Sequence, residues 1–341
     1  MSKLAKVGNI LVGADNPVTI QTMYDRSLRN IDKNFKERMI NLKLMGCDLI
    51  RFSFPDINEK ELLEYVVKNT PMPVIADIHY DYRNALTAIE CNVAAIRINP
   101  GNIGAWWKTV EIIKKASDYN CAVRIGLNSG SLPLGNNGTI NTMVNSALEY
   151  IDGMEKMNFH NIIVSLKSSD EKETIEANKL FHKMSDYPIH LGLTEAGGVI
   201  SSCIRSTWVL ASLLTNHIGD TLRYSISGSI EDEVLAGAEL LRMLGLRNKG
   251  IRLISCPTCG RNSFNTIEFL NSIYSELAVI NKDITVAIMG CVVNGPGEAK
   301  NANLAVCGIG NKVYIYKDGS IITEIDKTDA KKQLLKQIED Y

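Results

Sequence analysis

Several features that would set a chain apart from ordinary globular proteins are missing from this sequence of 341 residues. It has no run of about 18 apolar residues, so a membrane-spanning helix is not expected. Its first residues carry no apolar segment of the kind found in secretory signals. Its formal net charge is only -1, which argues against a general role on nucleic acids or membrane surfaces. We therefore expect a cytoplasmic globular protein that binds neither.

The sequence is also poor in cysteine for a disulfide-stapled fold. Eight cysteines in a chain of this length, with no export signal, favour free thiols or metal ligands. Four of them lie singly in predicted helices or at the starts of predicted strands, where a small buried apolar side chain is the simplest interpretation. These four are Cys47, Cys91, Cys121 and Cys203.

A recurring strand–helix unit predicts the fold class. Short β-branched runs predict eight strands, at 18–23, 48–53, 73–79, 94–100, 122–128, 161–167, 188–195 and 220–226. Helical patterns alternate with them, at 32–45, 106–119, 143–157, 171–184, 202–215 and 231–244. This alternation indicates parallel strands joined by crossover helices, and eight such units in about 240 residues match a closed (β/α)8, or TIM, barrel. An open doubly wound sheet is the competing topology.

A change of pattern near 245–250 predicts a domain boundary, so we assign 1–245 to the barrel and 246–341 to a second domain. Strands are predicted there at 251–255, 284–289, 303–307 and 312–316, with helices at 265–280 and 328–340. A hairpin turn is predicted at 317–320. These elements indicate a small α+β domain.

Polar residues stand at the end of every predicted barrel strand, where the chemistry of such barrels gathers. They are Gln21, Arg51, Asp77, His79, Arg97, Asn99, Arg124, Asn128, Lys167, Glu195, Arg223 and Ser225, and the apolar Met23 ends the first strand together with Gln21. The five cations among them greatly exceed the acids, and a buried ring of cations is costly unless an anion neutralises it. Since arginine fits phosphate oxygens well, the pattern predicts a substrate with two phosphates or a diphosphate. Salt bridges at the barrel rim are the alternative.

Two of these strand-end residues are candidates for proton transfer. Glu195 is a carboxylate expected among cations, so it is the preferred acid or base. His79 is either a proton donor or a hydrogen-bonded structural residue. Glycine turns at 99–102 and 128–131 favour close approach of the backbone to an anion, although turns commonly contain glycine for local reasons.

Two segments near the end of the chain predict a metal site. Cys256 and Cys259 have C-x-x-C spacing, Cys291 follows 32 residues later, and Glu298 lies seven residues beyond it. Three soft thiolates favour an iron–sulfur cluster, and a hard carboxylate as fourth ligand would leave one exchangeable corner for a substrate oxygen. A zinc site with Cys307 as fourth ligand and a redox-active dithiol at 256/259 remain open.

These same residues resemble the 4-hydroxy-3-methylbut-2-enyl diphosphate synthase family. The resemblance rests first on Cys256-Pro-Thr-Cys259-Gly-Arg261 and on Met289-Gly-Cys291-Val-Val-Asn294-Gly-Pro-Gly-Glu298. It extends over nearly the whole chain through Ala76-Asp-Ile-His79, Arg97-Ile-Asn-Pro-Gly-Asn102, Arg124-Ile-Gly-Leu-Asn-Ser-Gly-Ser131, Val164-Ser-Leu-Lys-Ser-Ser-Asp170, Leu193-Thr-Glu-Ala-Gly197 and Ile218-Gly-Asp-Thr221. The match is to the two-domain bacterial form of the family.

The resemblance implies a TIM barrel followed by a ferredoxin-like, or sulfite-reductase-like, domain with a [4Fe-4S] cluster. The implied cluster ligands are Cys256, Cys259, Cys291 and Glu298. The implied reaction is the reductive ring-opening and dehydration of 2-C-methyl-D-erythritol 2,4-cyclodiphosphate in the non-mevalonate isoprenoid pathway. The implied partners are flavodoxin or ferredoxin as electron donor and a second copy of the chain, in a head-to-tail homodimer whose cluster domains cap the opposite barrels.

The resemblance also implies a substrate site, with Glu195 and Glu298 in catalytic positions. Its substrate-binding positions are Arg51, His79, Arg97, Arg124, Asn128, Lys167, Arg205, Ser225 and Asn294. The chain departs from the family where a threonine-rich loop is replaced by residues 24–29, where a lysine–serine pair appears as Arg205-Ser206, and where the segment 132–138 is shortened. A divergent relative that binds diphosphates or senses redox state without turnover is the alternative function.

Overall fold

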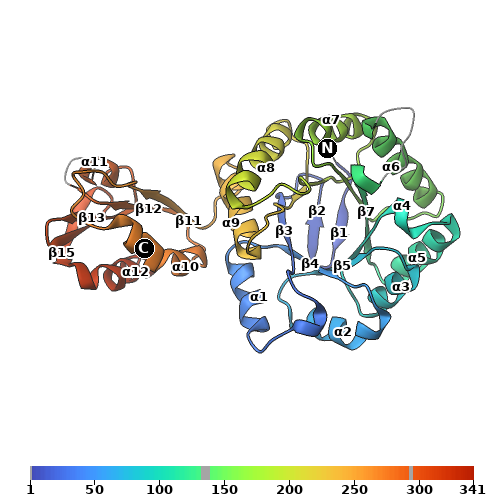
Figure 1. The fold of residues 1–341 in the computed structure, drawn as a ribbon, viewed down its shortest axis with the longest axis horizontal. Coiled ribbons are helices and arrows are strands. Elements are labelled where there is room, and N and C mark those ends of the chain that lie inside the picture. Colours follow the sequence, from blue (N-terminus) through green and yellow to red (C-terminus); the bar gives the residue numbers. More distant parts are fainter. Residues whose placement is uncertain (1, 132–138, 292–294) are drawn as a thin grey trace. The chain divides into compact units, whose positions relative to one another are not determined.

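The computed structural model describes residues 2–131, 139–291 and 295–341. The chain divides into two compact units, Met1–Arg247 and Asn248–Tyr341, and each is described by itself (Figure 1). Among the described helices, none is long and apolar enough to cross a membrane.

The first unit is a closed barrel of parallel strands. In the described part of the chain its eight-stranded sheet has the order β8-β7-β6-β5-β4-β3-β10-β9. The strands are β3 (Thr19–Met23), β4 (Leu49–Ser53), β5 (Val74–Ile78), β6 (Ala95–Ile98), β7 (Ala122–Asn128), β8 (Ile162–Lys167), β9 (His190–Leu191) and β10 (Thr221–Leu222). A parallel bridge between Val164 and Ile189 joins the two ends of the sheet. The prediction of a closed barrel is therefore confirmed, and the open sheet is excluded.

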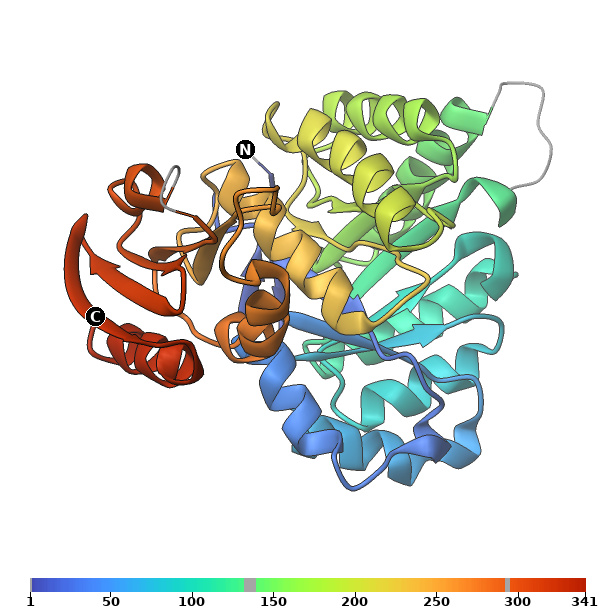
Figure 2. The same cartoon turned by 60° about the vertical axis from the view of Figure 1, so that its left-hand side comes forward.

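A layer of helices surrounds the barrel, as Figures 1 and 2 show. They are α1 (Phe35–Leu44), α2 (Lys60–Asn69), α3 (Tyr82–Glu90), α4 (Pro100–Ile103), α5 (Trp106–Asp118), α6 (Thr139–Glu155), α7 (Glu171–Met184), α8 (Val199–Leu214) and α9 (Ile230–Met243). Side chains that accept hydrogen bonds from free backbone N–H groups fix several starts, for example Asp170 before α7 and Ser229 before α9. Apolar residues on the inner faces of the helices complete the core between helices and strands.

A β-hairpin that we did not predict closes the end of the barrel at which the strands begin. Its strands are β1 (Ala5–Val7) and β2 (Ile10–Val12), which pair antiparallel. Ala5, Val7 and Val12 are fully buried against residues at or next to the start of five barrel strands: Leu49, Ile75, Ala95, Ala122 and Ile163. This apolar floor restricts access to the barrel interior to the opposite end, where the strands terminate.

The predicted ends of three barrel strands are wrong. The strand predicted at 188–195 is limited to His190–Leu191 and the single bridge of Ile189, and the one at 220–226 is limited to Thr221–Leu222. Beyond these points the backbone turns into the loops of the barrel mouth: Thr194 N donates to Ser168 O (3.1 Å), and Glu195 has a left-handed backbone (φ 55°). The strand predicted at 94–100 ends at Ile98, because Asn99 caps the short helix that begins at Pro100.

The second unit is a five-stranded sheet with helices on both faces. Its order is β11-β12-β13-β14-β15, in which the first three strands are parallel and the last two pairings are antiparallel. The strands are β11 (Ile251–Ser255), β12 (Ile284–Met289), β13 (Leu304–Ile309), β14 (Lys312–Lys317) and β15 (Ser320–Asp326), and the helices are α10 (Thr266–Ala278), α11 (Gly295–Ala299) and α12 (Ala330–Glu339). The predicted α+β class is confirmed, although β15 and α11 were not predicted.

The two faces of this sheet differ in the size of their side chains. On one face, branched residues such as Val286, Ile288 and Val306 pack against α10 and α12. On the other face, small residues such as Ala287 and Ala305 pack near α11 and against Cys307 and the partly buried Cys256. The side chains of a strand alternate between faces, so this pattern places the predicted metal ligand Cys256 on the face that carries α11.

Candidate functional site

The charged centre of the barrel is a layer of side chains two residues above the apolar floor. Asp77 pairs in register with Arg97, and Arg97 pairs with Arg124, so the three residues occupy the same level on β5, β6 and β7. Neighbours such as Ile96 and Ile125 belong to the core under the helices. Since side chains alternate along a strand, the two arginines and the aspartate point into the barrel.

Asp77 is the central anion of this layer. Its side chain is nearly completely buried, with Oδ1 at 3.4 Å from Arg97 Nη1 and Oδ2 at 3.8 Å from Arg51 Nε. His79 Nε2 also lies 3.2 Å from Oδ2. Burial by itself would raise the pKa of Asp77, but Arg51, the hydrogen bond from His79 and Arg97 together hold that pKa well below its usual range. Asp77 is therefore a permanent carboxylate that neutralises part of the cationic cluster.

Arg124 and Lys167 lack such a partner. Arg124 is almost fully buried and donates from Nη1 to Gln21 Oε1 (2.6 Å), while its Nε and Nη2 have no hydrogen-bond partner among the described residues. Lys167 is 7% exposed, and no ion pair of Lys167 occurs within the described ranges. Burial, followed by the neighbouring cations, holds the pKa of both groups well below the ordinary values. Neither side chain forms an ion pair with a carboxylate in the part of the chain that the structure describes.

Arg223 is the fifth cation, and its partner comes from outside the barrel. Glu233 on α9 accepts from Arg223 Nε (2.9 Å) and Nη2 (2.8 Å). Arg223 Nη1 lies 3.8 Å from Met23 Sδ, which also accepts from Arg51 Nη2 (2.8 Å). Five cations therefore face two carboxylates, Asp77 and Glu233, in the described interior of the barrel. Burial, opposed by Asp77, leaves the pKa of Arg51 lowered to about 10.

Two glycines make room for these long side chains. A Cβ atom at Gly126 on β7 would collide with the guanidinium of Arg97, which donates from Nη2 to the Gly126 carbonyl (3.1 Å). A Cβ atom at Gly192, after β9, would collide with Lys167 Nζ. The side chains of Arg97 and Lys167 thus cross the barrel directly against the backbone of neighbouring strands.

His190 is a buried group that sequence reasoning missed. It lies on β9, is fully buried, and places Nδ1 3.3 Å from Thr221 Oγ1, while Nε2 has no partner among the described residues. Burial and then the nearby Lys167 and Arg124 hold its pKa well below the usual value, so it is neutral. Gln21, Thr22 and Glu233 also join the network, and only Gln21 had been marked by its position at a strand end.

The remaining predicted site residues are distributed unevenly. Asn128 ends β7 in register with Lys167 and so belongs to the barrel mouth. Glu195 lies in the loop after β9 and is exposed, with no ion pair or hydrogen bond to any described residue. Ser225 lies two residues after Arg223, and its carbonyl accepts from Ser202 Oγ (3.0 Å). Asn294 lies outside the described residues.

Arg205 is directed toward a different set of partners. It pairs with Glu171 at the start of α7 and donates from Nη2 to Ser169 O (2.7 Å). These contacts occupy part of its hydrogen-bonding capacity, and substrate binding by Arg205 stays a prediction.

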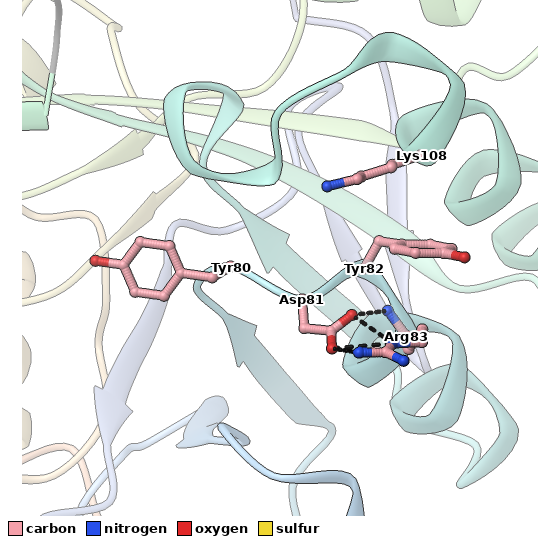
Figure 3. A pocket seen from close by; sticks show the side chains of 5 residues that line it. All are labelled: Tyr80, Asp81, Tyr82, Arg83 and Lys108. Carbon is pink, nitrogen blue, oxygen red and sulfur yellow. Dashed lines mark hydrogen bonds and ion pairs between the residues drawn. The ribbon is translucent and has the colours of Figure 1, made fainter.

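A surface hollow of about 360 Å³ lies beside the loop that follows β5 (Figure 3). Tyr80, Asp81, Tyr82, Arg83 and Lys108 line it. Asp81 caps α3 and pairs with Arg83 Nη2 at 2.6 Å, as the dashed lines of Figure 3 show. The Arg83 cation is therefore already neutralised locally, unlike the cations inside the barrel.

In the second unit, the predicted metal ligands lie on the connections that follow β11 and β12 at one end of the sheet. Cys256 directly follows β11, and its N–H donates to Ile288 O on β12 (3.0 Å). The other end of the same loop is fastened by Ser263 N, which donates to Gly290 O (2.9 Å). The C-x-x-C segment is thus pinned at both ends next to Cys291. Gly295 N donates to Cys291 O (3.2 Å) and begins the helix α11 that carries Glu298.

The side chains at this end of the sheet are not gathered as ligands. In the described ranges, no three His, Cys, Asp or Glu side chains are arranged to hold a metal ion. Cys259 is exposed, Cys256 is half-buried and Cys291 is buried. The backbone placement and the donor set, three thiols and one carboxylate on adjacent connections, nevertheless fit an iron–sulfur cluster.

Cys307 differs from the other three cysteines. It lies within β13 rather than in a loop, is fully buried, and is the register partner of Met289. Burial and then Cys291 raise the pKa of Cys307 to about 12. Its side chain is a structural apolar group, which argues against the zinc alternative. The isolated Cys47, Cys91 and Cys121 are buried as predicted, and Cys203 is only partly buried.

Comparison with known proteins identifies the family. Residues 2–238 match the family described as the GcpE TIM-barrel domain, and residues 252–340 match the GcpE protein C-terminal domain. The chain belongs to the GcpE family. The GcpE match covers both units, which agrees with the resemblance found in the sequence.

Curated GcpE relatives are similar along nearly their whole length. A protein of Clostridium acetobutylicum named 4-hydroxy-3-methylbut-2-en-1-yl diphosphate synthase (flavodoxin) is 40% identical, with 99% of this chain and 98% of the relative covered. A protein of Treponema pallidum with the same name is 42% identical, with 93% and 83% covered. One of Geobacter sulfurreducens, also of that name, is 40% identical, with 98% and 96% covered.

Solved structures that resemble this GcpE chain share its fold at low identity. Dihydropteroate synthase from Thermus thermophilus has a TM-score of 0.53 at 11% identity, covering 71% of this chain and 99% of that one. The N-acetylneuraminic acid synthetase of Leptospira borgpetersenii has a TM-score of 0.51 at 15% identity, covering 80% and 98%. These likenesses concern the fold alone.

Proposed function

We propose that this GcpE chain is a 4-hydroxy-3-methylbut-2-en-1-yl diphosphate synthase. It opens the ring of 2-C-methyl-D-erythritol 2,4-cyclodiphosphate reductively, with loss of water, in the non-mevalonate isoprenoid pathway. Flavodoxin supplies the electrons, in line with the names of the relatives. The assignment as an iron–sulfur oxidoreductase follows from family membership over both units.

The observation that carries this proposal is the excess of positive charge inside the barrel. Arg51 and Arg97 share Asp77, and Arg223 has Glu233, whereas Arg124 and Lys167 have no carboxylate among the described residues. Burying unpaired cations is costly, and an anionic ligand offsets that cost. A cyclic diphosphate supplies two linked phosphates, so it neutralises several cations at once. The apolar floor below leaves the strand ends as the binding side.

Different residues of the barrel bind different parts of the substrate. Arg97 and Arg124 hold phosphate oxygens, while Lys167 and Asn128, as register partners, bind beside them. His79, fixed by Asp77, is available to hydrogen-bond a phosphate or hydroxyl oxygen at the mouth. We assign Glu195 the role of acid or base, because it is a carboxylate free of local partners in the loop above β9. Ser225 and Asn294 complete the proposed set.

We infer that Cys256, Cys259, Cys291 and Glu298 hold a [4Fe-4S] cluster. Such a cluster supplies electrons one at a time and a Lewis-acidic iron. The chain contributes the two pinned ends of the C-x-x-C loop, which bring the thiols to one end of the sheet, and the carboxylate from α11. Glu298, a hard ligand among thiols, is expected to be the exchangeable one.

The test of this function is turnover under anaerobic conditions. Protein purified without oxygen should be brown, contain iron and sulfide, and convert the cyclic diphosphate when reduced flavodoxin is present. Glu298→Ala should lose most turnover while folding normally, and Glu324→Ala, an exposed carboxylate on β15, serves as the control. Binding of the cyclic diphosphate without any turnover by the wild type would instead support the redox-sensing relative. Absence of iron and sulfide would reject the proposal.

We further propose that two chains form a head-to-tail homodimer, in which the cluster unit of one serves the barrel of the other. Mixing two inactive variants tests this arrangement. If Lys167→Met and Cys291→Ala subunits exchange freely, half the dimers are mixed and one site in each is intact, so activity should return to about a quarter of the wild-type value. If each chain instead serves its own barrel, no activity should return.

A further inference from the structure

Glu233 is a buried carboxylate that no step of the proposed reaction uses. It extends from α9, outside the strands, and is only 3% exposed. Its two oxygens accept from four donors: Arg223 Nε (2.9 Å) and Thr22 Oγ1 (2.7 Å) at Oε2, and Arg223 Nη2 (2.8 Å) and Ile226 N (3.2 Å) at Oε1. The carboxylate thus ties β3, the loop after β10 and α9 together.

This arrangement fixes the direction of the Arg223 guanidinium. Glu233 engages Nε and one N–H of Nη2, so Nη1 is the nitrogen that Glu233 leaves unused. Arg223 Nη1 lies on the side of Met23 Sδ, which also accepts from Arg51. The backbone of Arg223 is anchored as well, since its N–H donates to Leu191 O (3.0 Å). A planar guanidinium held through two parallel hydrogen bonds has little rotational freedom left.

We propose that Glu233 is a positioning residue for the substrate: it holds Arg223 so that Nη1 faces the diphosphate. The proposal rests on the function proposed above and deepens it by adding a residue that never touches the substrate. A simpler role is that of a counter-charge, which lowers the cost of burying Arg223 and repels the anionic substrate. The two roles predict opposite effects when the charge is removed and the shape is kept.

Glu233→Gln separates the two roles. If Glu233 positions Arg223, the amide loses one of the two arginine hydrogen bonds, and the dissociation constant for the cyclic diphosphate should rise about 10-fold. If Glu233 is only a counter-charge, loss of the negative charge should make binding tighter. Binding is measured by calorimetry on the intact, cluster-containing protein without reductant, so that turnover does not interfere. Tighter or unchanged binding overturns the proposal.

Glu231→Gln is the matched control. Glu231 lies on the same helix and also pairs with an arginine through two hydrogen bonds, to Arg38 Nε (2.7 Å) and Nη2 (3.1 Å), but Arg38 is on α1 outside the barrel. Its substitution should leave the dissociation constant unchanged. A melting temperature close to the wild-type value confirms that each variant folds.

A double-mutant comparison shows whether Glu233 acts through Arg223. In an Arg223→Ala background, Glu233→Gln should weaken binding no further, because the side chain that it positions is gone. An equal 10-fold loss in both backgrounds would overturn the proposal. Wild-type protein that neither binds nor converts the cyclic diphosphate would reject the proposed function itself, whereas a functional wild type with a normal Glu233→Gln variant rejects only this inference.

Discussion

The charged interior of the barrel and the cysteine edge of the second unit, which comprises the loops that carry Cys256, Cys259 and Cys291, position their functional side chains in different ways. In the barrel, strand register fixes Asp77, Arg97 and Arg124. Asp77 and Arg97 form an ion pair, and Arg124 is held by one hydrogen bond to Gln21. At the cysteine edge the backbone is pinned, but the side chains are not arranged as ligands in the described ranges. The barrel fold thus fixes the charged side chains themselves, whereas in the second unit the described hydrogen bonds fix the backbone that carries the predicted ligands.

The difference has a physical cause. Guanidinium and carboxylate groups hold one another by directional hydrogen bonds, so a cationic pocket can be stable before the substrate arrives. Thiols make only weak hydrogen bonds and gain their binding energy from the metal itself. Loss of the proposed cluster should therefore loosen the loops that carry Cys256, Cys259 and Cys291 and leave the barrel site intact.

Cys291→Ala should have the largest effect on turnover, and it tests the cysteine-bearing loops of the second unit. Removing the Cys291 thiol leaves two thiolates and one carboxylate as proposed ligands. Because iron–sulfur clusters are held mainly by thiolates, the cluster and all turnover should be lost. Iron and sulfide analysis and visible absorption of anaerobic protein measure the loss. Binding of the cyclic diphosphate to the barrel should persist.

Cys307→Ala is the control for this experiment, because Cys307 is a nearby buried thiol within a strand. It should keep iron and activity at some cost in stability. Loss of iron in Cys307→Ala would show instead that Cys307 is a ligand.

Lys167→Met tests the cationic interior of the barrel. Removal of an unpaired buried cation should weaken binding of the cyclic diphosphate about 100-fold. The same change should stabilise the free protein by about 1 kcal/mol, because an uncompensated charge is no longer buried. Calorimetric binding and urea unfolding measure the two effects, and iron content should not change. A variant that is less stable than the wild type would mean that Lys167 has a structural partner.

Asp77→Asn should destabilise the barrel by about 3 kcal/mol at pH 7, because Arg51 and Arg97 lose their shared carboxylate. The pKa of Asp77 is lowered in the folded state, so its contribution to stability is present above the pKa of the unfolded chain, about 3.9, and is lost as the pH falls below it. The difference in free energy of unfolding between variant and wild type should therefore be constant above about pH 4 and shrink as the pH falls below it, vanishing only at the much lower pKa of the folded state.

Urea unfolding between pH 7 and pH 3 checks the Asp77 prediction. Asp118→Asn, on the exposed end of α5, is the control and should behave as the wild type at every pH. A constant difference between Asp77→Asn and the wild type across this range would contradict the assigned charge state.

Val12→Ala should have the smallest effect on function. It removes two methyl groups from the fully buried floor of the barrel and should cost about 2 kcal/mol of stability. Because the floor lies away from the strand ends, the dissociation constant for the cyclic diphosphate should stay at the wild-type value. A weakened affinity would show that the floor, too, shapes the site.

Local patterns in the sequence predicted much of this molecule. β-Branched runs marked all eight barrel strands, and polar residues at their ends marked Arg51, Asp77, Arg97, Arg124 and Lys167. The hairpin of residues 5–12 was missed because its short strands carry no periodic signal long enough to detect. Glu233 was missed because, following Ser229, it reads as an ordinary acidic residue in the first turn of a helix.

The order of residues by itself determined the alternation of strands and helices, the five cations and the spacing of the cysteines, because each depends on neighbours along the chain. Only the tertiary structure decided which charges are paired. Arg223 and Thr22 both donate to Glu233, Arg124 donates to Gln21, and Arg205 pairs with Glu171, although all of these residues are polar in the sequence. Whether a charge is neutralised depends on groups brought within a few ångströms by folding, and these lie up to 211 residues away in the chain.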